Sequence, residues 1–238
     1  MTLTPEDRAM TTKGEGARGT GGRWISFDCF GTLIDWRAGY HAILEPFAGA
    51  RTPALIDAYH EFEHPIEKER PHKLYREVLQ LAVERGAAKI GLPPGQSDAL
   101  VRRWQDLPIY PDTAAALGAL RAAGWKIGIL TNCDEDLFAK TLARHPVLRP
   151  DLLVTAELVQ SYKPDLGHFR RFEAESAVER GSWVHAACSW FHDIVPAHGL
   201  GIATVYVDRE RTGQKGPEAT RVVTGVADLA TVAAELVA

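Results

Sequence analysis

The sequence predicts an α/β protein whose core is a mainly parallel sheet of about five strands, with a helical insert after the first strand. Two observations lead to this fold class. Short apolar segments alternate with segments of helical period over most of the chain, whereas residues 38–108 show helical patterns and no convincing strand. Alternating strands and helices of these lengths are typical of βαβ units, in which neighbouring strands run parallel.

Five segments are predicted to be strands because their interiors are apolar throughout, as expected for strands covered on both faces. They are residues 23–30, 124–133, 151–159, 183–190 and 202–209. Four helices are predicted from apolar residues at helical spacing, a glycine stop and acidic residues in a first turn. They are residues 113–124, 134–145, 167–179 and 227–238.

The chain divides into three predicted parts. Residues 1–22 are rich in Gly and Thr and lack apolar periodicity, which predicts a disordered tail. Residues 23–37 and 109–238 form the predicted sheet domain. Residues 38–108, called the insert below, form a predicted domain of helices placed between those two stretches.

Composition excludes several classes of partner. A net charge of −4 gives no basic field for nucleic acid or an anionic membrane. No apolar run approaches the roughly 18 residues that span a bilayer, and residues 1–22 lack the apolar region of a secretory signal. Three scattered cysteines match no disulfide or zinc spacing. We therefore expect a cytoplasmic protein that binds neither nucleic acid nor membrane.

Polar side chains stand at the carboxyl ends of four predicted strands. Asp28 ends the first, Thr131 and Asn132 end the second, Lys163 follows the third and Asp193 follows the fourth. Each residue alone has a local explanation, such as a turn or a helix cap. Ligands of open parallel sheets, however, bind beyond the carboxyl ends of the strands, so the set together predicts an active site at that edge.

These stretches resemble the four motifs of the haloacid dehalogenase superfamily. The motifs are DCFGTL (28–33), LTN (130–132), YKPD (162–165) and CSWFHD (188–193), in the superfamily's order. The resemblance covers residues 23 to about 230, and the insert is placed like the superfamily's cap. It implies a Rossmann-like core, a helical cap domain over the site and a hydrolase with an aspartate nucleophile.

The resemblance implies a role for each motif residue. Asp28 is expected to attack the substrate and form a covalent ester that water then splits. Lys163 is expected to keep Asp28 ionised by lowering its pKa. Thr131 and Asn132 are expected to donate hydrogen bonds to Asp28 or to a substrate anion, and Asp193 to orient or activate the hydrolytic water.

Two positions separate dehalogenases from phosphatases in this superfamily. Phe30 stands where the phosphatases carry a general-acid Asp, and a phenyl ring cannot transfer a proton. Cys188 stands where many carry an Asp that binds Mg²⁺, and a neutral thiol is a poor ligand for that ion. Both favour the type II 2-haloacid dehalogenase subgroup, so we expect hydrolytic dehalogenation of a small 2-haloacid without a cofactor or metal.

Two alternatives stay open. A phosphatase acting on a small phosphate ester would bind Mg²⁺ through Asp28, the Phe30 carbonyl and Asp193. A catalytically inactive binding protein of the same fold is the other, although the intact Asp28, Lys163 and Asp193 count against it. Assembly as a homodimer is also left open.

The expected substrate contacts depart in part from the subgroup, whose members resemble one another in a cap Arg. The corresponding region here is Tyr59-His60, and Phe169 replaces a Tyr of those enzymes. His192 is considered both as a base and as a packing residue. Other charged residues of the insert, His64 among them, are expected to face solvent. Six residues are expected to contact a small-molecule substrate: Phe30, Thr32, His60, Phe169, Ser189 and Trp190.

Overall fold

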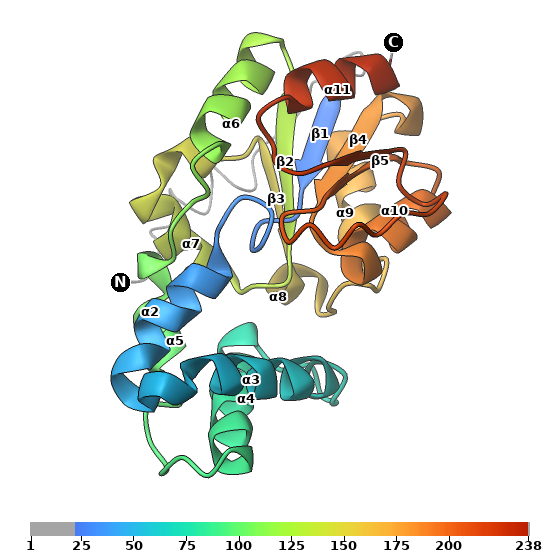
Figure 1. The fold of residues 1–238 in the computed structure, drawn as a ribbon. Helices are drawn as coiled ribbons and strands as arrows, with labels where there is room; N and C mark the ends of the chain where they lie inside the picture. The colour runs from blue at the N-terminus through green and yellow to red at the C-terminus, as the bar shows by residue number, and fades with distance from the viewer. Residues whose placement is uncertain (1–21, 238) are drawn as a thin grey trace.

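The computed structural model describes residues 22–237, and it confirms the predicted α/β class. Within these residues six parallel strands form one sheet in the order β3-β2-β1-β4-β5-β6 (Figure 1). The strands are β1 (Trp24–Phe27), β2 (Lys126–Thr131), β3 (Leu152–Thr155), β4 (Trp183–Ala187), β5 (Ala203–Val207) and β6 (Arg221–Val223). The predicted tail lies outside the described residues except for residue 22.

Helices cover both faces of the sheet, which explains the continuous apolar runs. In β2, Ile127 and Ile129 belong to one hydrophobic cluster, whereas Leu130 belongs to another, with Phe172. The four predicted helices are present as α6 (Thr113–Ala122), α7 (Glu135–Arg144), α9 (Gly167–Ser176) and α11 (Leu229–Leu236). Shorter helical turns are η3 (Pro146–Leu148), α8 (Ala156–Val159), η4 (Arg180–Ser182), η5 (Trp190–Ile194) and α10 (Val195–Gly199).

Two predicted strands were too long, because they run into helical turns, and one strand was missed. The fourth predicted strand runs to residue 190, but β4 ends at Ala187 and Trp190 begins η5. The third predicted strand continues to residue 159, but β3 ends at Thr155, whose hydroxyl accepts a hydrogen bond from the Leu158 N–H and begins α8. The sequence also gave no sign of β6. That strand has three residues, is largely exposed and pairs only with β5, so it lacks the apolar run that marks a covered strand.

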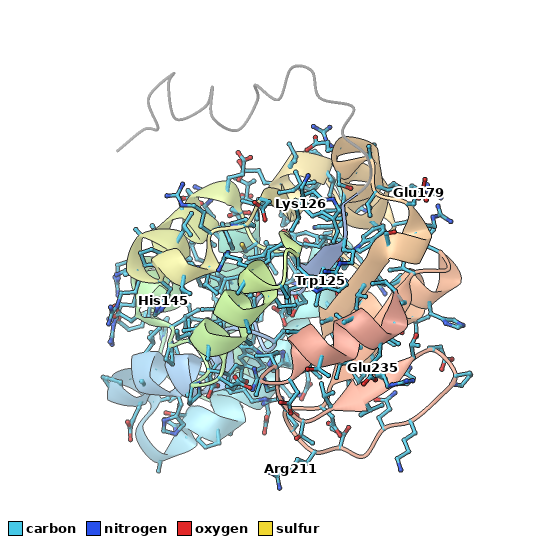
Figure 2. All side chains as sticks on the ribbon, turned by 90° about the horizontal axis from the view of Figure 1, so that it is seen from above. Trp125, Lys126, His145, Glu179, Arg211 and Glu235 are labelled. Carbon is cyan, nitrogen blue, oxygen red and sulfur yellow. The ribbon has the colours of Figure 1, made fainter. Side chains whose placement is uncertain are left out.

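The insert contains helices joined by loops, with no strand among its residues, and lies at the carboxyl ends of the strands (Figure 1). Figure 2 views the opposite end, where Trp125 and Lys126 mark the start of β2. The stretch between β1 and α6 contains α2 (Trp36–Ala48), η1 (Gly49–Arg51), α3 (Thr52–Glu67), α4 (Tyr75–Lys89), α5 (Ala99–Arg102) and η2 (Trp104–Asp106). No helix of the described residues is long and apolar enough to cross a membrane.

Several contacts fix the insert to the sheet domain, and two of them explain its placement. Its two ends lie side by side, because Ile34 and Ile109 form an antiparallel bridge. The second link is Asp134, a fully buried residue just before α7. Its carboxylate accepts hydrogen bonds from the backbone N–H groups of Tyr75 (2.7 Å) and Arg76 (2.9 Å), so it satisfies the free amides at the start of α4.

Close packing on the sheet gives a stability prediction for Gly128. A Cβ at this position in β2 would overlap the ring of Phe172, which is held between Trp24 and Trp183 with ring centroids 5.2 and 4.9 Å away. We expect Gly128→Ala to lower the free energy of unfolding by about 1–3 kcal/mol in urea denaturation. Gly118→Ala in α6 meets open space and should instead raise it by about 0.5–1 kcal/mol.

Candidate active site

One buried ammonium group joins the two catalytic carboxylates that the sequence predicted. Lys163 Nζ lies 2.9 Å from Asp28 Oδ1 and 2.7 Å from Asp193 Oδ1. Its third hydrogen bond, also 2.9 Å, goes to the Leu130 carbonyl. An ammonium group has three N–H donors, so all of them are used and the side chain is held in one position.

The two carboxylates differ in pKa, and Asp28 departs from the expectation. Burial raises the pKa of Asp28, Lys163 lowers it less, and the negative charge of Asp193 raises it further, so it lies above the usual range. Burial also acts to raise the pKa of Asp193, but Lys163 and His185 together bring it well below its usual range. Lys163 thus lowers the pKa of Asp28 as expected, but burial, with the charge of Asp193 added, outweighs it, so the net shift is upward.

Thr32 holds Asp28 and does not line the pocket where substrate contacts were expected. The side chain is fully buried, and its hydroxyl donates to Asp28 Oδ2 over 2.9 Å. The Thr32 hydroxyl oxygen in turn accepts the Cys188 N–H at 2.9 Å. Arg209 holds the turn through a 2.8 Å hydrogen bond to the Thr32 carbonyl. Gly31 has a φ of +97°, and a Cβ there would lie 2.6 Å from Cys188 Sγ, so this turn requires glycine.

Asn132 and Thr131 occupy the predicted place but make different contacts. The Asn132 side chain bonds the backbone of Lys163, accepting from its N–H at 2.8 Å and donating to its carbonyl at 3.3 Å. It therefore fixes the loop that carries the lysine, in place of the expected hydrogen bond to Asp28. The Thr131 hydroxyl is buried, lines the pocket and has no hydrogen-bond partner among the described residues.

A buried chain of hydrogen bonds leads from the sheet to Asp193, and the sequence did not indicate it. Trp183 Nε1 donates to Ser26 Oγ (2.7 Å), which lies 2.8 Å from His185 Nδ1. His185 Nε2 in turn lies 3.1 Å from Asp193 Oδ1. Since the indole can only donate, the serine proton is free to point at Nδ1, which directs the Nε2–H of His185 toward Asp193. We infer that His185 orients Asp193.

A cavity of about 310 Å³ opens above the two carboxylates. Among the predicted contact residues, Phe30, His60 and Ser189 line it, and the Phe30 ring packs on Trp104 with centroids 4.7 Å apart. The other two aromatic predictions are not supported. Phe169 is fully buried against His185 in the core, because α9 turns it toward the sheet. Trp190 packs on Tyr206 and does not line the cavity.

The insert presents a polar helix face to this cavity. The residues of this face follow one another at helical spacing and all line the cavity: His60, Glu63, His64 and Glu67. The expectation that His64 faces solvent is therefore wrong. The spacing of three, four and seven residues in HEFEHPIE was the available signal, since it places these side chains on one side of a helix.

No free cation replaces the cap Arg among the described lining residues. The two lining arginines are paired, Arg37 with Glu210 and Arg209 with Asp112. Glu63 accepts hydrogen bonds from Tyr59, at 2.6 Å, and from Tyr75. Burial acts to raise the pKa of Glu63, but these bonds and His60 bring it below its usual range. The wall facing Asp28 thus carries carboxylates and imidazoles.

The residues around Asp28 fit a Mg²⁺ ion poorly. The thiol of Cys188 lies 3.9 Å from Asp28 Oδ2 and 4.0 Å from the Phe30 carbonyl, where an oxygen ligand is needed. Burial raises the pKa of this thiol, which keeps it neutral. The Oδ1 atoms of both carboxylates already bind Lys163. The donor set therefore argues against the magnesium phosphatase alternative.

Comparison with known proteins agrees with this geometry. Residues 23–181 match the haloacid dehalogenase-like hydrolase family, and the chain belongs to that family. The protein is therefore a hydrolase of this type, and the predicted resemblance to the superfamily and its type II 2-haloacid dehalogenases is confirmed. Enzymes of that subgroup are cofactor-independent, which is consistent with the expectation that none is used at Asp28.

Three similar proteins illustrate the relationship. (S)-2-haloacid dehalogenase 1 of Pseudomonas sp. (strain CBS-3) is 30% identical, over 77% of this chain and 83% of its own. (S)-2-haloacid dehalogenase 4A of Burkholderia cepacia is 26% identical, over 77% and 82%. The L-2-haloacid dehalogenase from Xanthobacter autotrophicus, solved with chloropropionic acid covalently bound, shares the fold with a TM-score of 0.75 at 19% identity, covering 88% of this chain and 97% of its own.

The shared ammonium predicts a pH-dependent loss of stability in Lys163→Met. Removing it leaves two buried carboxylates without a counter-ion. We therefore expect the free energy of unfolding, measured in urea at pH 7, to fall by about 3–5 kcal/mol. Both carboxyl pKa values then rise in the folded state, so the folded form binds more protons and the deficit shrinks as pH falls toward 4.

Lys89→Met is the matched control, because it breaks an ion pair with Glu61 that is half exposed. This substitution should lower the free energy of unfolding by less than about 1 kcal/mol at either pH. A Lys163→Met deficit that stays constant between pH 7 and pH 4 would contradict the shared-charge account.

Proposed function

We propose that the protein hydrolyses a small 2-haloacid through a covalent ester on Asp28. The observation that carries this proposal is a buried carboxylate, held by Lys163 and Thr32 below the pocket, with Phe30 where a proton donor would stand. The names of the two curated relatives, both (S)-2-haloacid dehalogenases, support this substrate class. The covalently bound chloropropionic acid of the Xanthobacter enzyme supports the ester.

The first step is an SN2 displacement. A carboxylate oxygen of Asp28 forms a bond to the carbon that bears the halogen while the carbon–halogen bond breaks, and the halide leaves with the bonding electrons. Halide is a weak base and leaves without being protonated. The reaction therefore needs no proton donor at the position of Phe30. Because the pKa of Asp28 is raised, its ionised form is a more basic and hence stronger nucleophile than an exposed aspartate.

The second step splits the ester. Water attacks the ester carbonyl carbon of Asp28, and Asp193 orients that water and accepts its proton. Asp193 Oδ2 is buried and has no hydrogen-bond partner among the described residues, so it is available for this contact. The carbonyl–oxygen bond then breaks and the product leaves as a hydroxy acid. Asp28 is left ionised with one oxygen from water, and one proton is released.

Two hydrogen-bond donors take the place of the cap Arg in this proposal: the Thr131 hydroxyl and the Nε2–H of a doubly protonated His60 ring, whose Nδ1–H donates to Glu63 Oε2 at 3.0 Å. His60 Nε2 and Thr131 Oγ1 belong to residues that line the cavity, and both atoms are buried without a partner in the described chain. They stand on opposite sides of it, one on α3 of the insert and one at the end of β2. We propose that they bind the substrate carboxylate, and that residues 38–108 act as a cap which excludes bulk water.

Single-turnover labelling tests the covalent step. With enzyme in excess over 2-chloropropionate in H₂¹⁸O, we expect one ¹⁸O atom in Asp28, because the ester is split at its carbonyl carbon. Tandem mass spectrometry of the peptide that spans residues 24–37 reads the label. Asp35 lies in the same peptide and should stay unlabelled, which makes it an internal control. Label found only in the product would falsify the ester mechanism.

Assays with and without Mg²⁺ separate this proposal from the phosphatase alternative. Halide release from 2-chloropropionate should persist in EDTA, because the counter-ion of Asp28 is Lys163 and not a metal ion. Hydrolysis of para-nitrophenyl phosphate should stay at background with added Mg²⁺. The proposal is overturned if phosphate release rises with Mg²⁺ while halide release is absent. Absence of both activities would instead favour the inactive binding protein.

A further inference from the structure

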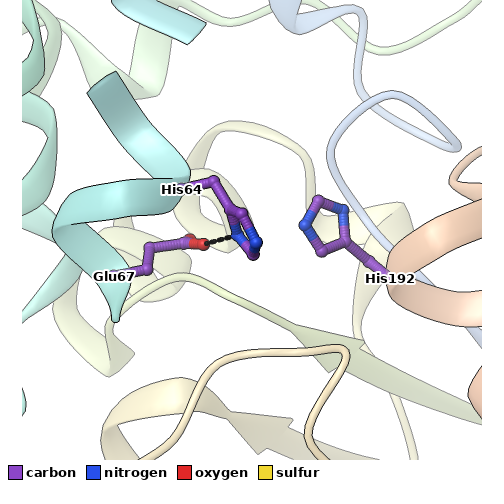
Figure 3. A group of neighbouring side chains, drawn as sticks. All are labelled: His64, Glu67 and His192. Carbon is purple, nitrogen blue, oxygen red and sulfur yellow. Dashed lines mark hydrogen bonds and ion pairs between the residues drawn. The ribbon is translucent and has the colours of Figure 1, made fainter. Parts of the chain in front are cut away.

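A second group of ligating side chains lines the same cavity as Asp28. His64 and Glu67 project from α3 of the insert, and His192 projects toward them from η5, which follows β4 (Figure 3). Each residue offers one ligand atom, and these atoms all lie within 4.8 Å of one another. None of the three residues takes part in the reaction proposed for Asp28.

Glu67 is a buried carboxylate that no Lys or Arg of residues 22–237 pairs with. Its side chain is 5% exposed, and its contact in the group is a long one, 3.4 Å from Oε2 to His64 Nδ1. A cation placed between Glu67 and the imidazoles would relieve this unfavourable burial.

His192 is held in the orientation that metal-binding histidines adopt. Ser189 Oγ lies 3.0 Å from His192 Nδ1, and it also accepts the backbone N–H of His192. Nε2 is buried and has no hydrogen-bond partner among the described residues. With Nδ1–H donating to Ser189, the lone pair of Nε2 is free for a metal, and the outer hydrogen bond fixes the ring. The His64 ring faces it, with centroids 5.7 Å apart.

We propose that His64, Glu67 and His192 bind one divalent transition-metal ion, for which Zn²⁺ is the best match. Two imidazoles and one carboxylate suit Zn²⁺ and its neighbours in the series, whereas Mg²⁺ and Ca²⁺ prefer all-oxygen sites. A neutral imidazole nitrogen with a free lone pair is the form of histidine that binds such an ion. Three protein ligands leave a fourth position for water.

A bound ion would connect the insert to the sheet across the opening of the cavity. Its ligands come from α3 on one side and from the residue next to Asp193 on the other. The site is distinct from the magnesium position of the phosphatase alternative, which uses Asp28, the Phe30 carbonyl and Asp193. Because binding is read without turnover, its test does not depend on the reaction proposed at Asp28.

Metal binding to the chelator-treated full chain tests the proposal. In competition with a chromophoric chelator, we expect one tightly held Zn²⁺ per chain. Co²⁺ should enter the same site and give the intense visible absorption of a four- or five-coordinate ion, and Zn²⁺ should displace it. A faint octahedral Co²⁺ spectrum, or no competition with the chelator, would overturn the site even if no variant could be purified.

Variants locate the ion. His64→Gln and His192→Gln should each weaken Zn²⁺ binding by at least about 100-fold, the upper end of what loss of an outer-shell partner costs. His41→Gln, at an exposed position on α2, should bind as the unaltered chain does. Circular dichroism checks that each variant is folded. Folded His64→Gln and His192→Gln proteins with unchanged affinity would place the ion elsewhere and refute the assignment.

Discussion

The ammonium group of Lys163 is the interaction on which the active site depends. It lies between Asp28 and Asp193 in a place that water barely reaches, and without it two negative charges would face each other in a low dielectric. Because its third donor is tied to the Leu130 carbonyl, the group cannot turn toward a substrate. Its contribution is to hold the charges of the protein itself, and substrate recognition falls to other residues.

The parallel sheet explains how distant parts of the chain supply this arrangement. Asp28 follows the central strand β1, and the neighbouring strands β2 and β4 deliver Thr131 and the turn that holds Asp193. Supporting contacts fix each catalytic group from its own side: Thr32 holds Asp28, Asn132 holds the backbone of Lys163, and His185 holds Asp193. The rigidity of the site therefore comes from hydrogen bonds made beneath the pocket.

Sequence reasoning succeeded where a pattern is local and repeated. Five strands, four helices and the positions of Asp28, Lys163 and Asp193 follow from apolar runs and motif order. It failed at β6, whose three residues are too short and exposed to leave a pattern, and at Phe169, whose direction depends on how α9 packs. The direction of the pKa shift at Asp28 could not be predicted either, because it depends on how far burial outweighs the nearby Lys163, and burial follows from the tertiary fold.

The bridge between Ile34 and Ile109 has a consequence for how such a protein can change over evolutionary time. Both crossings into the insert lie side by side, and every hydrogen bond among Asp28, Lys163, Asp193 and Thr32 is made outside it. The helices between the crossings can therefore be remodelled, lengthened or exchanged without disturbing the nucleophile. Selection can therefore act on the part of the cavity wall that the insert supplies while preserving the contacts that hold Asp28.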